Sequence, residues 1–317
     1  MGILIDGRWY DQPPNANGDD GRFVRQDSVF RNWVTANGEP GPTGEGGFPA
    51  EPGRYRLYVS LACPWAHRTL IFRQLKGLES MIPVAVTHWR MLENGWTFEP
   101  GPGVQPDGDT GIAAMHELYT LANPRQSGRA TVPVLWDRQK RTIVNNESAD
   151  IIRMFNSAFD DVGAAAGDYH PEPLREEIDR LNSRIYDTVN NGVYRAGFAT
   201  TQAAYNEAVA PLFDTLDWLE ARLAQQRFLC GDTLTEADWR LFTTLVRFDA
   251  VYHGHFKCNL RRLVDYPRLH AYARELYLWP GVAQTVNFQH IKGHYYESHR
   301  NINPSGIVPA GPIPDWE

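Results

Sequence analysis

Cysteine is scarce in this chain. Its 317 residues include three cysteines, Cys63, Cys230 and Cys258. They are too few and too scattered to form the disulfide framework of a secreted protein. A reducing compartment fits the chain best, and we expect a cytoplasmic protein.

Long apolar runs and blocks of basic residues are also lacking. No stretch approaches the roughly 20 apolar residues of a membrane-spanning helix, and the first residues do not resemble a secretory leader. The chain has 31 basic and 38 acidic residues and a net charge of -7. Nucleic acid and anionic membrane surfaces are therefore poor partners, and we expect a soluble, unexported protein that binds neither.

Hydrophobic and aromatic residues are plentiful. The hydrophobic content of 42% is sufficient for the cores of two domains in a chain of 317 residues. Ten tryptophans and 14 tyrosines can line a pocket for flat aromatic substrates, although core packing accounts for most of them.

The first half of the chain shows the pattern of a thioredoxin-like domain. Alternation and apolar spacing predict, in order, a strand over 54–60, a helix over 65–78, a strand over 82–88, an insertion over 90–128 with a short helix over 111–121, strands over 130–136 and 141–144, and a helix over 147–155. Because Pro133 interrupts a strand, it belongs at a sheet edge or at a bend with a cis peptide bond.

The second half is predicted to be all-helical. Apolar residues three or four positions apart predict helices over 172–190, 202–225, 235–248 and 267–277. Thr235 and Asp238 form a variant capping box at the start of the third helix, in which Asp replaces the preferred Glu or Gln.

These patterns divide the chain into five parts. The expected parts are an N-terminal extension (1–50), a thioredoxin-like domain (51–157, with the insertion 90–128), a linker (158–170), an all-helical domain (171–300) and a C-terminal tail (301–317).

Cys63 stands where the first predicted strand ends and the first helix begins, directly before Pro64. The positive end of the helix dipole and its unpaired N–H groups favour a thiolate there, and proline suits the first helical position. A dithiol motif would have its second cysteine at position 66, which is Ala66. A nucleophilic Cys63 would therefore need a resolving thiol from elsewhere, most simply a small soluble one. The alternative is a buried structural cysteine.

Seven motifs carry a resemblance to a known family. They are Cys63-Pro-Trp-Ala66, Asn94-Gly-Trp-Thr-Phe98, Ala130-Thr-Val-Pro133, Asn146-Glu-Ser148, Asn191-Gly-Val-Tyr-Arg195, Arg247-Phe-Asp-Ala-Val-Tyr-His-Gly-His-Phe-Lys-Cys-Asn259 and Ile291-Lys-Gly-His-Tyr-Tyr296. A thioredoxin-like half with a helix-end thiol, joined to an all-helical half, resembles the cytosolic glutathione transferases. The motifs look like those of the Xi class, the glutathionyl-hydroquinone reductases.

The resemblance implies an enzyme that uses glutathione to reduce S-glutathionyl-hydroquinones to hydroquinones and releases glutathione disulfide. It makes Cys63 the nucleophile and glutathione the resolving thiol, and it implies a homodimer with no metal. By the same analogy glutathione is bound by Trp96, Arg129, Ala130, Thr131, Val132, Glu147 and Ser148.

The chemistry of these residue types agrees with glutathione binding. Val132 can offer its backbone N–H and C=O to the cysteinyl part of the tripeptide. Glu147 and Ser148, at a helix start, can bind the γ-glutamyl ammonium and carboxylate. Arg129 could pair with the glycyl carboxylate, and Trp96 could cover the peptide. The alternatives are a helix N-cap for Asn146 or Ser148, a solvated charge for Arg129 and core packing for Trp96.

Three tyrosines match the family's hydroquinone site: Tyr194, Tyr252 and Tyr295. A tyrosine hydroxyl can protonate a leaving group or donate to a thiolate while its ring stacks on a flat substrate. The resemblance implies that Tyr194 is the acid. It also implies that Tyr252 and Tyr295 stabilise the Cys63 thiolate. Tyr296 adjoins Tyr295, so the sequence alone does not choose between these two.

Other functions remain open at this stage. An Omega-like thioltransferase or dehydroascorbate reductase would use the same cysteine, and a non-catalytic binding module would have this fold without a reactive thiol. His67 follows Cys63 by four residues, and we expect a helix-surface side chain. The sequence also contains histidine and cysteine clusters that could be imagined as a metal site, although their spacing matches no familiar zinc pattern; they are His253, His255 and Cys258, and His290, His294 and His299.

Overall fold

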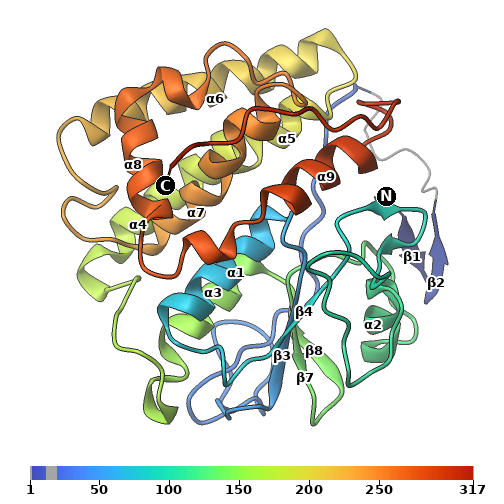
Figure 1. Cartoon of the computed structure of the whole chain (residues 1–317). Helices are drawn as coiled ribbons and strands as arrows, with labels where there is room; N and C mark the ends of the chain where they lie inside the picture. Colours follow the sequence, from blue (N-terminus) through green and yellow to red (C-terminus); the bar gives the residue numbers. More distant parts are fainter. Residues whose placement is uncertain (1, 12–19, 317) are drawn as a thin grey trace. The chain divides into compact units, whose positions relative to one another are not determined.

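The computed structural model describes residues 2–11 and 20–316. The described chain divides into two compact units (Figure 1). The first contains residues 2–11, 26–167 and 285–294, and the second contains residues 20–25, 168–284 and 295–316. The main division between Gly167 and Asp168 lies inside the segment predicted to be a linker.

A four-stranded mixed sheet forms the centre of the first unit. Its strand order is β4-β3-β7-β8. The strands are β3 (Tyr55–Val59), β4 (Val84–Val86), β7 (Val134–Asp137) and β8 (Thr142–Asn145). Only the β3–β4 pair in this sheet is parallel. This is the sheet of a thioredoxin-like domain, as the βαβ and ββα patterns predicted.

Two helices of the first unit follow from local sequence signals. Helix α1 (Pro64–Leu75) begins with a proline, and helix α3 (Ser148–Ser157) begins after a side chain that caps it; the two helices lie side by side (Figure 1). The predicted first helix runs three residues too far, because the chain turns at Gly77, whose φ of 61° lies in the left-handed region. The Val132–Pro133 peptide bond is cis and directly precedes β7, so the predicted bend is confirmed.

The first unit also has elements in the N-terminal extension and in the insertion. The N-terminal extension contains a hairpin of β1 (Ile3–Ile5) and β2 (Arg8–Tyr10), and Leu4 N–H donates to the carbonyl of Gly128. The insertion contains β5 (Met91–Leu92), β6 (Gly95–Trp96) and α2 (Met115–Ala122). Helix α2 lies within the short helix that the sequence suggested over 111–121, apart from its last residue.

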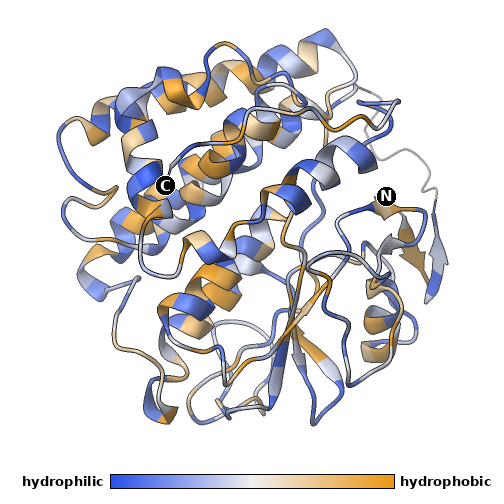
Figure 2. Cartoon of the chain, viewed as in Figure 1, coloured by the Kyte–Doolittle hydropathy of each residue, from blue (hydrophilic) through white to orange (hydrophobic). Residues whose placement is uncertain are grey.

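The second unit is helical. Its α-helices are α4 (Arg175–Ile185), α5 (Gly192–Gly197), α6 (Gln202–Leu223), α7 (Glu236–Arg247) and α8 (Pro267–Tyr277). They carry hydrophobic and hydrophilic stretches, as amphipathic helices do (Figure 2). The predicted capping box is confirmed at the start of α7, where Thr235 N–H donates to the Asp238 carboxylate.

Shorter turns complete the described structure. The chain forms π-helical turns at Tyr186–Asn190 and Phe248–Tyr252 and 3-10 turns at Asp160–Val162, Glu172–Leu174, Leu263–Asp265 and Ala283–Thr285. A final helix, α9 (Phe288–Ser298), was not predicted. No helix of residues 2–11 and 20–316 is long and apolar enough to cross a membrane.

Candidate active site

Cys63 caps the N-terminus of helix α1. Its backbone is extended, with φ -75° and ψ 121°, and Pro64 takes the first helical position. The side chain is 8% exposed, and its Sγ lies 3.6 Å from the carbonyl oxygen of Val132. The thiol therefore sits at the positive end of a helix, the position that the sequence predicted.

The loop before β7 lies beside this thiol. The carbonyl of Val132 accepts from Cys63, whereas its N–H has no hydrogen-bond partner in the part of the chain that the structure describes. Buried backbone N–H groups are nearly always paired, and Val132 is 5% exposed. This N–H is therefore available to an extended peptide placed against the loop.

Glu147 and Ser148 meet at the start of helix α3. One oxygen of the Glu147 carboxylate accepts from Ala149 N–H at 3.0 Å, and the other accepts from the Ser28 hydroxyl at 3.0 Å. The N-cap is thus Glu147, and the alternative in which Asn146 or Ser148 caps the helix is wrong. Ser148 is buried, and its hydroxyl accepts from the guanidinium of Arg68 at 3.3 Å.

Trp96 and Arg129 differ in their surroundings. Trp96 is 7% exposed, and its ring stacks on His294 with centroids 4.7 Å apart. That contact agrees with the packing alternative, although one ring face can pack while the other covers a ligand. Arg129 is half-buried, and its role stays a prediction.

The second unit brings the three predicted tyrosines together. The hydroxyl oxygen of Tyr295 lies 2.5 Å from that of Tyr194 and 3.0 Å from that of Tyr252. Tyr194 comes from α5, Tyr252 from the π-helical turn and Tyr295 from α9. Tyr296 instead donates to the carbonyl of Ala250 at 3.4 Å.

Burial keeps two of these phenols protonated. Tyr252 and Tyr295 are 0% exposed, and burial raises the pKa of each well above 10.0. The guanidinium of Arg247 opposes this rise in pKa. Tyr194, the third member, is half-buried. A chain of hydroxyl groups thus runs from a buried pair of phenols to a partly exposed one.

Sequence reasoning missed two neighbours of Tyr194 in the N-terminal extension. The guanidinium carbon of Arg25 lies 4.9 Å from the centre of the Tyr194 ring, and its Nε donates to Asn191 at 2.9 Å. The ring of Phe23 stacks on Tyr194 with centroids 6.3 Å apart. A cation over a phenol ring is attractive, so the extension contributes to the surroundings of the predicted acid. Its sequence gave no signal for this contact.

The histidines do not follow the predictions made for them. His67 is buried, not at the helix surface, and its Nε2 lies 2.8 Å from the hydroxyl of Thr285. His255 and His299 are buried with ring nitrogens 3.2 Å apart. Burial and the charge of Lys257 lower the pKa of His255 to about 4.

The metal alternative gains no geometric support. Burial raises the pKa of Cys258, which disfavours the thiolate that a metal needs. Within residues 2–11 and 20–316, the group whose ligand atoms lie within 4.8 Å of one another is His170, Asp179 and Glu236. It contains none of the residues considered from the sequence.

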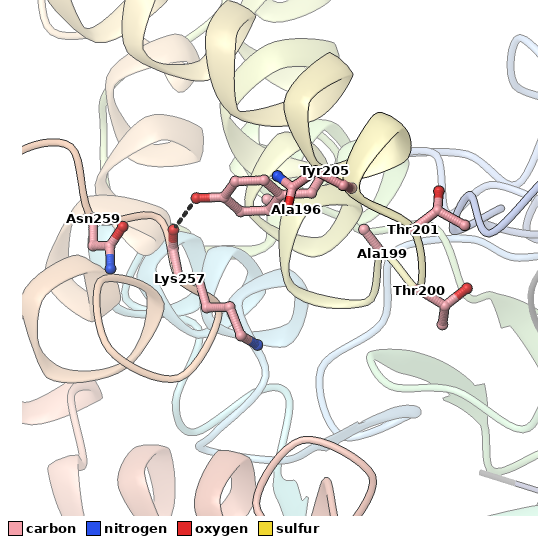
Figure 3. Close-up of a pocket in the computed structure, with 8 residues that line it drawn as sticks. Ala196, Ala199, Thr200, Thr201, Tyr205, Lys257 and Asn259 are labelled. Carbon is pink, nitrogen blue, oxygen red and sulfur yellow. Dashed lines mark hydrogen bonds between the residues drawn. The ribbon is translucent and has the colours of Figure 1, made fainter.

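A surface depression of about 400 Å³ lies elsewhere in the second unit (Figure 3). Figure 3 shows the hydroxyl of Tyr205 donating to the carbonyl of Lys257, a bond of 2.7 Å. None of the predicted site residues lines this depression, whose walls are Ala196, Ala199, Thr200, Thr201, Gln202, Tyr205, Lys257 and Asn259.

Comparison with known proteins identifies the family. Residues 62–158 match the model of the glutathione S-transferase N-terminal domain, and residues 202–275 match that of the C-terminal domain. The chain is 59% identical to glutathionyl-hydroquinone reductase YqjG of Escherichia coli (strain K12), with 100% of this chain and 97% of the relative covered. The chain belongs to the Xi-class glutathione S-transferases, the glutathionyl-hydroquinone reductases.

Further Xi-class relatives agree over nearly the whole length. Glutathionyl-hydroquinone reductase PcpF of Sphingobium chlorophenolicum is 57% identical, with 98% of this chain and 96% of the relative covered. The glutathione-bound structure of Escherichia coli YqjG superposes with a TM-score of 0.92 at 57% identity, covering 99% of this chain and 97% of the other. The Xi-class glutathione transferase of Natrialba magadii gives a TM-score of 0.93 at 48% identity, covering 100% and 95%.

These findings confirm the family and the fold class that the motifs predicted. This Xi-class transferase combines a thioredoxin-like domain with an all-helical domain. It is an enzyme by its membership of this family. The roles predicted for individual site residues stay predictions.

Proposed function

We propose that this Xi-class enzyme reduces S-glutathionyl-hydroquinones to hydroquinones, with glutathione as the reductant and glutathione disulfide as the second product. The observation that carries the proposal is the hydrogen-bonded set of Tyr194, Tyr252 and Tyr295. A thioltransferase acting on simple disulfides has no need of three converging phenols, whereas a departing hydroquinone needs a proton. The names of the relatives YqjG and PcpF support the same activity.

In the first proposed half-reaction, Cys63 attacks the substrate's sulfur. The hydroquinone ring tautomerises to a keto form, so that the carbon bearing sulfur can depart with the bonding electrons. The Cys63 thiolate then forms an S–S bond to glutathionyl sulfur as the C–S bond breaks. The bonding electrons move to the keto oxygen, which takes up the proton that Tyr194 supplies, while the carbon keeps the hydrogen that it gained on tautomerisation. The products are free hydroquinone and Cys63 disulfide-bonded to glutathione.

In the second half-reaction, a second glutathione restores the enzyme. Its thiolate attacks the mixed disulfide, forming glutathione disulfide and releasing the Cys63 thiolate. The aromatic carbon has been reduced and two glutathionyl sulfurs have been oxidised to a disulfide, so the electrons balance. Because position 66 is Ala66, a second cysteine of a dithiol motif is not there to resolve the intermediate, and glutathione takes that part.

We place glutathione in the first unit, against the loop at Val132 and the start of α3. The N–H of Val132 offers a donor to the cysteinyl carbonyl. The carboxylate of Glu147 and the hydroxyl of Ser148 face the γ-glutamyl group, and Arg129 pairs with the glycyl carboxylate. The glutathione-bound structure of YqjG supports a tripeptide site in this fold.

The remaining parts of the proposal concern the setting of the enzyme. We propose a cytoplasmic homodimer, in keeping with the glutathione transferase family, whose reaction requires no metal. The low cysteine content fits a reducing compartment, where free glutathione is available as the resolving thiol.

The test is product analysis with purified enzyme, an S-glutathionyl-hydroquinone and excess glutathione. We expect hydroquinone and glutathione disulfide to appear in equal amounts, measured by chromatography, and neither to form with Cys63→Ala. A parallel assay with a glutathione mixed disulfide of a simple alkyl thiol separates the Omega-like alternative. Reduction of that mixed disulfide without any hydroquinone release would overturn the proposal.

A further inference from the structure

Tyr119 is a buried residue of the insertion to which the proposed reaction gives no part. It lies in helix α2 and is 0% exposed. The ring packs edge-on against Phe30 of the N-terminal extension, with centroids 5.8 Å apart. Its hydroxyl, however, points at two segments that we propose to bind glutathione.

The first segment is the loop before β7. The Tyr119 hydroxyl accepts from Thr131 N–H at 3.2 Å, and it lies 3.1 Å from both the carbonyl oxygen and the hydroxyl of Thr131. Thr131 directly precedes Val132, whose N–H is proposed to meet the tripeptide. Tyr119 therefore contacts the peptide unit that presents this donor, through the Thr131 carbonyl, and the unit before it, through Thr131 N–H.

The second segment is the start of α3. The side-chain amide of Asn146 donates to the Tyr119 hydroxyl at 3.0 Å, and Asn146 directly precedes Glu147. The side-chain oxygen of Asn146 accepts from Phe30 N–H at 3.1 Å, and Asn146 N–H donates to the Phe30 carbonyl at 3.1 Å. The extension and the insertion thus meet at the same asparagine.

A tyrosine hydroxyl has one proton and two acceptor positions, and this hydroxyl uses all three. It accepts from Thr131 N–H and from the Asn146 amide, and its proton goes to an oxygen of Thr131. Burial raises the pKa of Tyr119, so the donor is kept at any pH at which the protein works. Phenylalanine in its place would leave unpaired the N–H of the half-buried Thr131 and the amide of the buried Asn146.

We infer that Tyr119 is a positioning residue for the glutathione site: through Thr131 and Asn146 it holds the backbone that binds the cysteinyl part of glutathione in register with the side chains that bind its γ-glutamyl part. The inference rests on the proposed function. It also assigns a task to the insertion and to part of the N-terminal extension, since α2 and Phe30 hold the hydroxyl and the amide in place.

The experiment compares Tyr119→Phe with Tyr55→Phe. Tyr55 is also 0% exposed in the first unit, and its hydroxyl donates to the carbonyl of Pro49 at 2.6 Å, so both variants lose a buried hydroxyl. The readouts are equilibrium binding of S-methylglutathione, which cannot react at Cys63 as a thiol, and thermal unfolding. We expect Tyr119→Phe to raise the Kd about tenfold, in keeping with the loss of a buried hydrogen-bond partner, and Tyr55→Phe to change it less than about twofold.

Steady-state kinetics separates positioning from general loss of stability. With Tyr119→Phe, the KM for glutathione should rise about tenfold while kcat at saturating glutathione stays within about twofold of the native value. Asn146→Ala serves as a second variant that removes the amide donor and should shift the Kd in the same direction. If Tyr119→Phe does not fold, the Kd of Asn146→Ala for S-methylglutathione tests the inference in its place.

Two outcomes would overturn the inference alone. In one, the native protein binds S-methylglutathione and Tyr119→Phe, or Asn146→Ala where it decides, binds it equally well. In the other, Tyr55→Phe weakens binding as much as Tyr119→Phe, which would make the effect one of stability. Failure of the native, folded protein to bind S-methylglutathione at all would instead overturn the glutathione site itself, and the inference with it.

Discussion

The hydroxyl oxygens of Tyr194 and Tyr295 lie 2.5 Å apart, and the hydrogen bond between them links these two members of the tyrosine cluster. Tyr295 also bonds to Tyr252 at 3.0 Å, so it is the central member. Tyr194 is half-buried, and the proposed mechanism makes it the acid. A proton given up by Tyr194 can be replaced along this chain of hydroxyl groups.

Removing the hydroxyl groups should therefore slow hydroquinone release. We expect Tyr194→Phe to lower kcat by roughly 100-fold, the usual contribution of a general acid, and Tyr295→Phe to lower it by roughly tenfold, because the acid loses its partner. Steady-state kinetics with an S-glutathionyl-hydroquinone measures both.

Tyr296→Phe is the matched control, because the Tyr296 hydroxyl bonds to Ala250 and not to the cluster. We expect its kcat to stay within about twofold of the native value. An equal loss of kcat in Tyr295→Phe and Tyr296→Phe would contradict the proposal that Tyr295 supports the acid Tyr194.

Gly197 lets Phe256 pack beside the tyrosine cluster. A Cβ at Gly197 would lie 2.1 Å from the Phe256 ring, whereas a Cβ at Gly192 of the same helix would meet no atom closer than 3.7 Å. We expect Gly197→Ala to lower the free energy of unfolding by about 1–3 kcal/mol through overpacking and to reduce kcat. Gly192→Ala should be neutral or stabilising by up to about 1 kcal/mol. Urea unfolding measures the free energy of unfolding of the two variants. Similar free energies for both would contradict the packing argument.

The buried His255 should make stability depend on pH. Its pKa falls from 6.5 to about 4 through burial and the charge of Lys257. A depressed folded-state pKa stabilises the protein above pH 6.5, and that stabilisation is lost as the pH falls toward 4. Between pH 7 and pH 5, protonation of this group alone should lower the free energy of unfolding by about 2 kcal/mol.

The glutamine in His255→Gln cannot take up this proton. From pH 7 to pH 5 the free energy of unfolding of this variant should therefore fall by about 2 kcal/mol less than that of the native protein. Urea unfolding at pH 7 and pH 5 measures the difference. His253→Gln, at a half-buried position two residues earlier, is the control and should follow the native protein. If His255→Gln follows it as well, the buried imidazole is not the source of the pH dependence.

Ser148 should affect glutathione binding without holding α3 together. The helix is capped by Glu147 and not by Ser148. We therefore expect Ser148→Ala to raise the KM for glutathione about tenfold, as the loss of a hydrogen bond to a charged group does. Because the buried Arg68 guanidinium loses an acceptor, thermal stability should fall by no more than about 1–3 kcal/mol. Ser157→Ala, at the last residue of the same helix, should change neither quantity. A large loss of stability without a KM effect in Ser148→Ala would show a structural role only.

Elements with local signals could be predicted from the sequence. Helix α8 has the predicted bounds because Pro267 marks its first residue and the apolar spacing ends at Tyr277. The capping box of Thr235 and Asp238 could be found for the same reason. Each signal lies within one turn of the element that it starts.

Elements without regular apolar spacing were missed. Helix α9 buries polar side chains as well as apolar ones, His290 and His294 among them, so its sequence shows no clear apolar face. The hairpin of β1 and β2 has strands of three residues. Its turn did carry a signal, since Asp6 and Gly7 have φ of 47° and 79°, the left-handed pair that an Asp-Gly hairpin turn uses.

The candidate site likewise contains residues that the sequence could reveal and residues that it could not. Cys63 could be found from its place between a strand and a proline. Tyr119 and Arg25 could not, because their partners are distant in the chain: Asn146 is 27 residues from Tyr119, and Asn191 is 166 residues from Arg25. Only the folded chain shows these neighbours, and neither residue belongs to a motif that would have drawn attention to it.

The most direct test of the account is mass spectrometry of the protein after incubation with an S-glutathionyl-hydroquinone and no free glutathione. The account predicts one glutathionyl group on Cys63, an equal amount of released hydroquinone, and loss of the adduct when glutathione is added. Cys63→Ala should show neither adduct nor hydroquinone. Hydroquinone release in Cys63→Ala at the native rate, or a native protein that takes up glutathione from simple disulfides and never from the aryl thioether, would contradict the central claim.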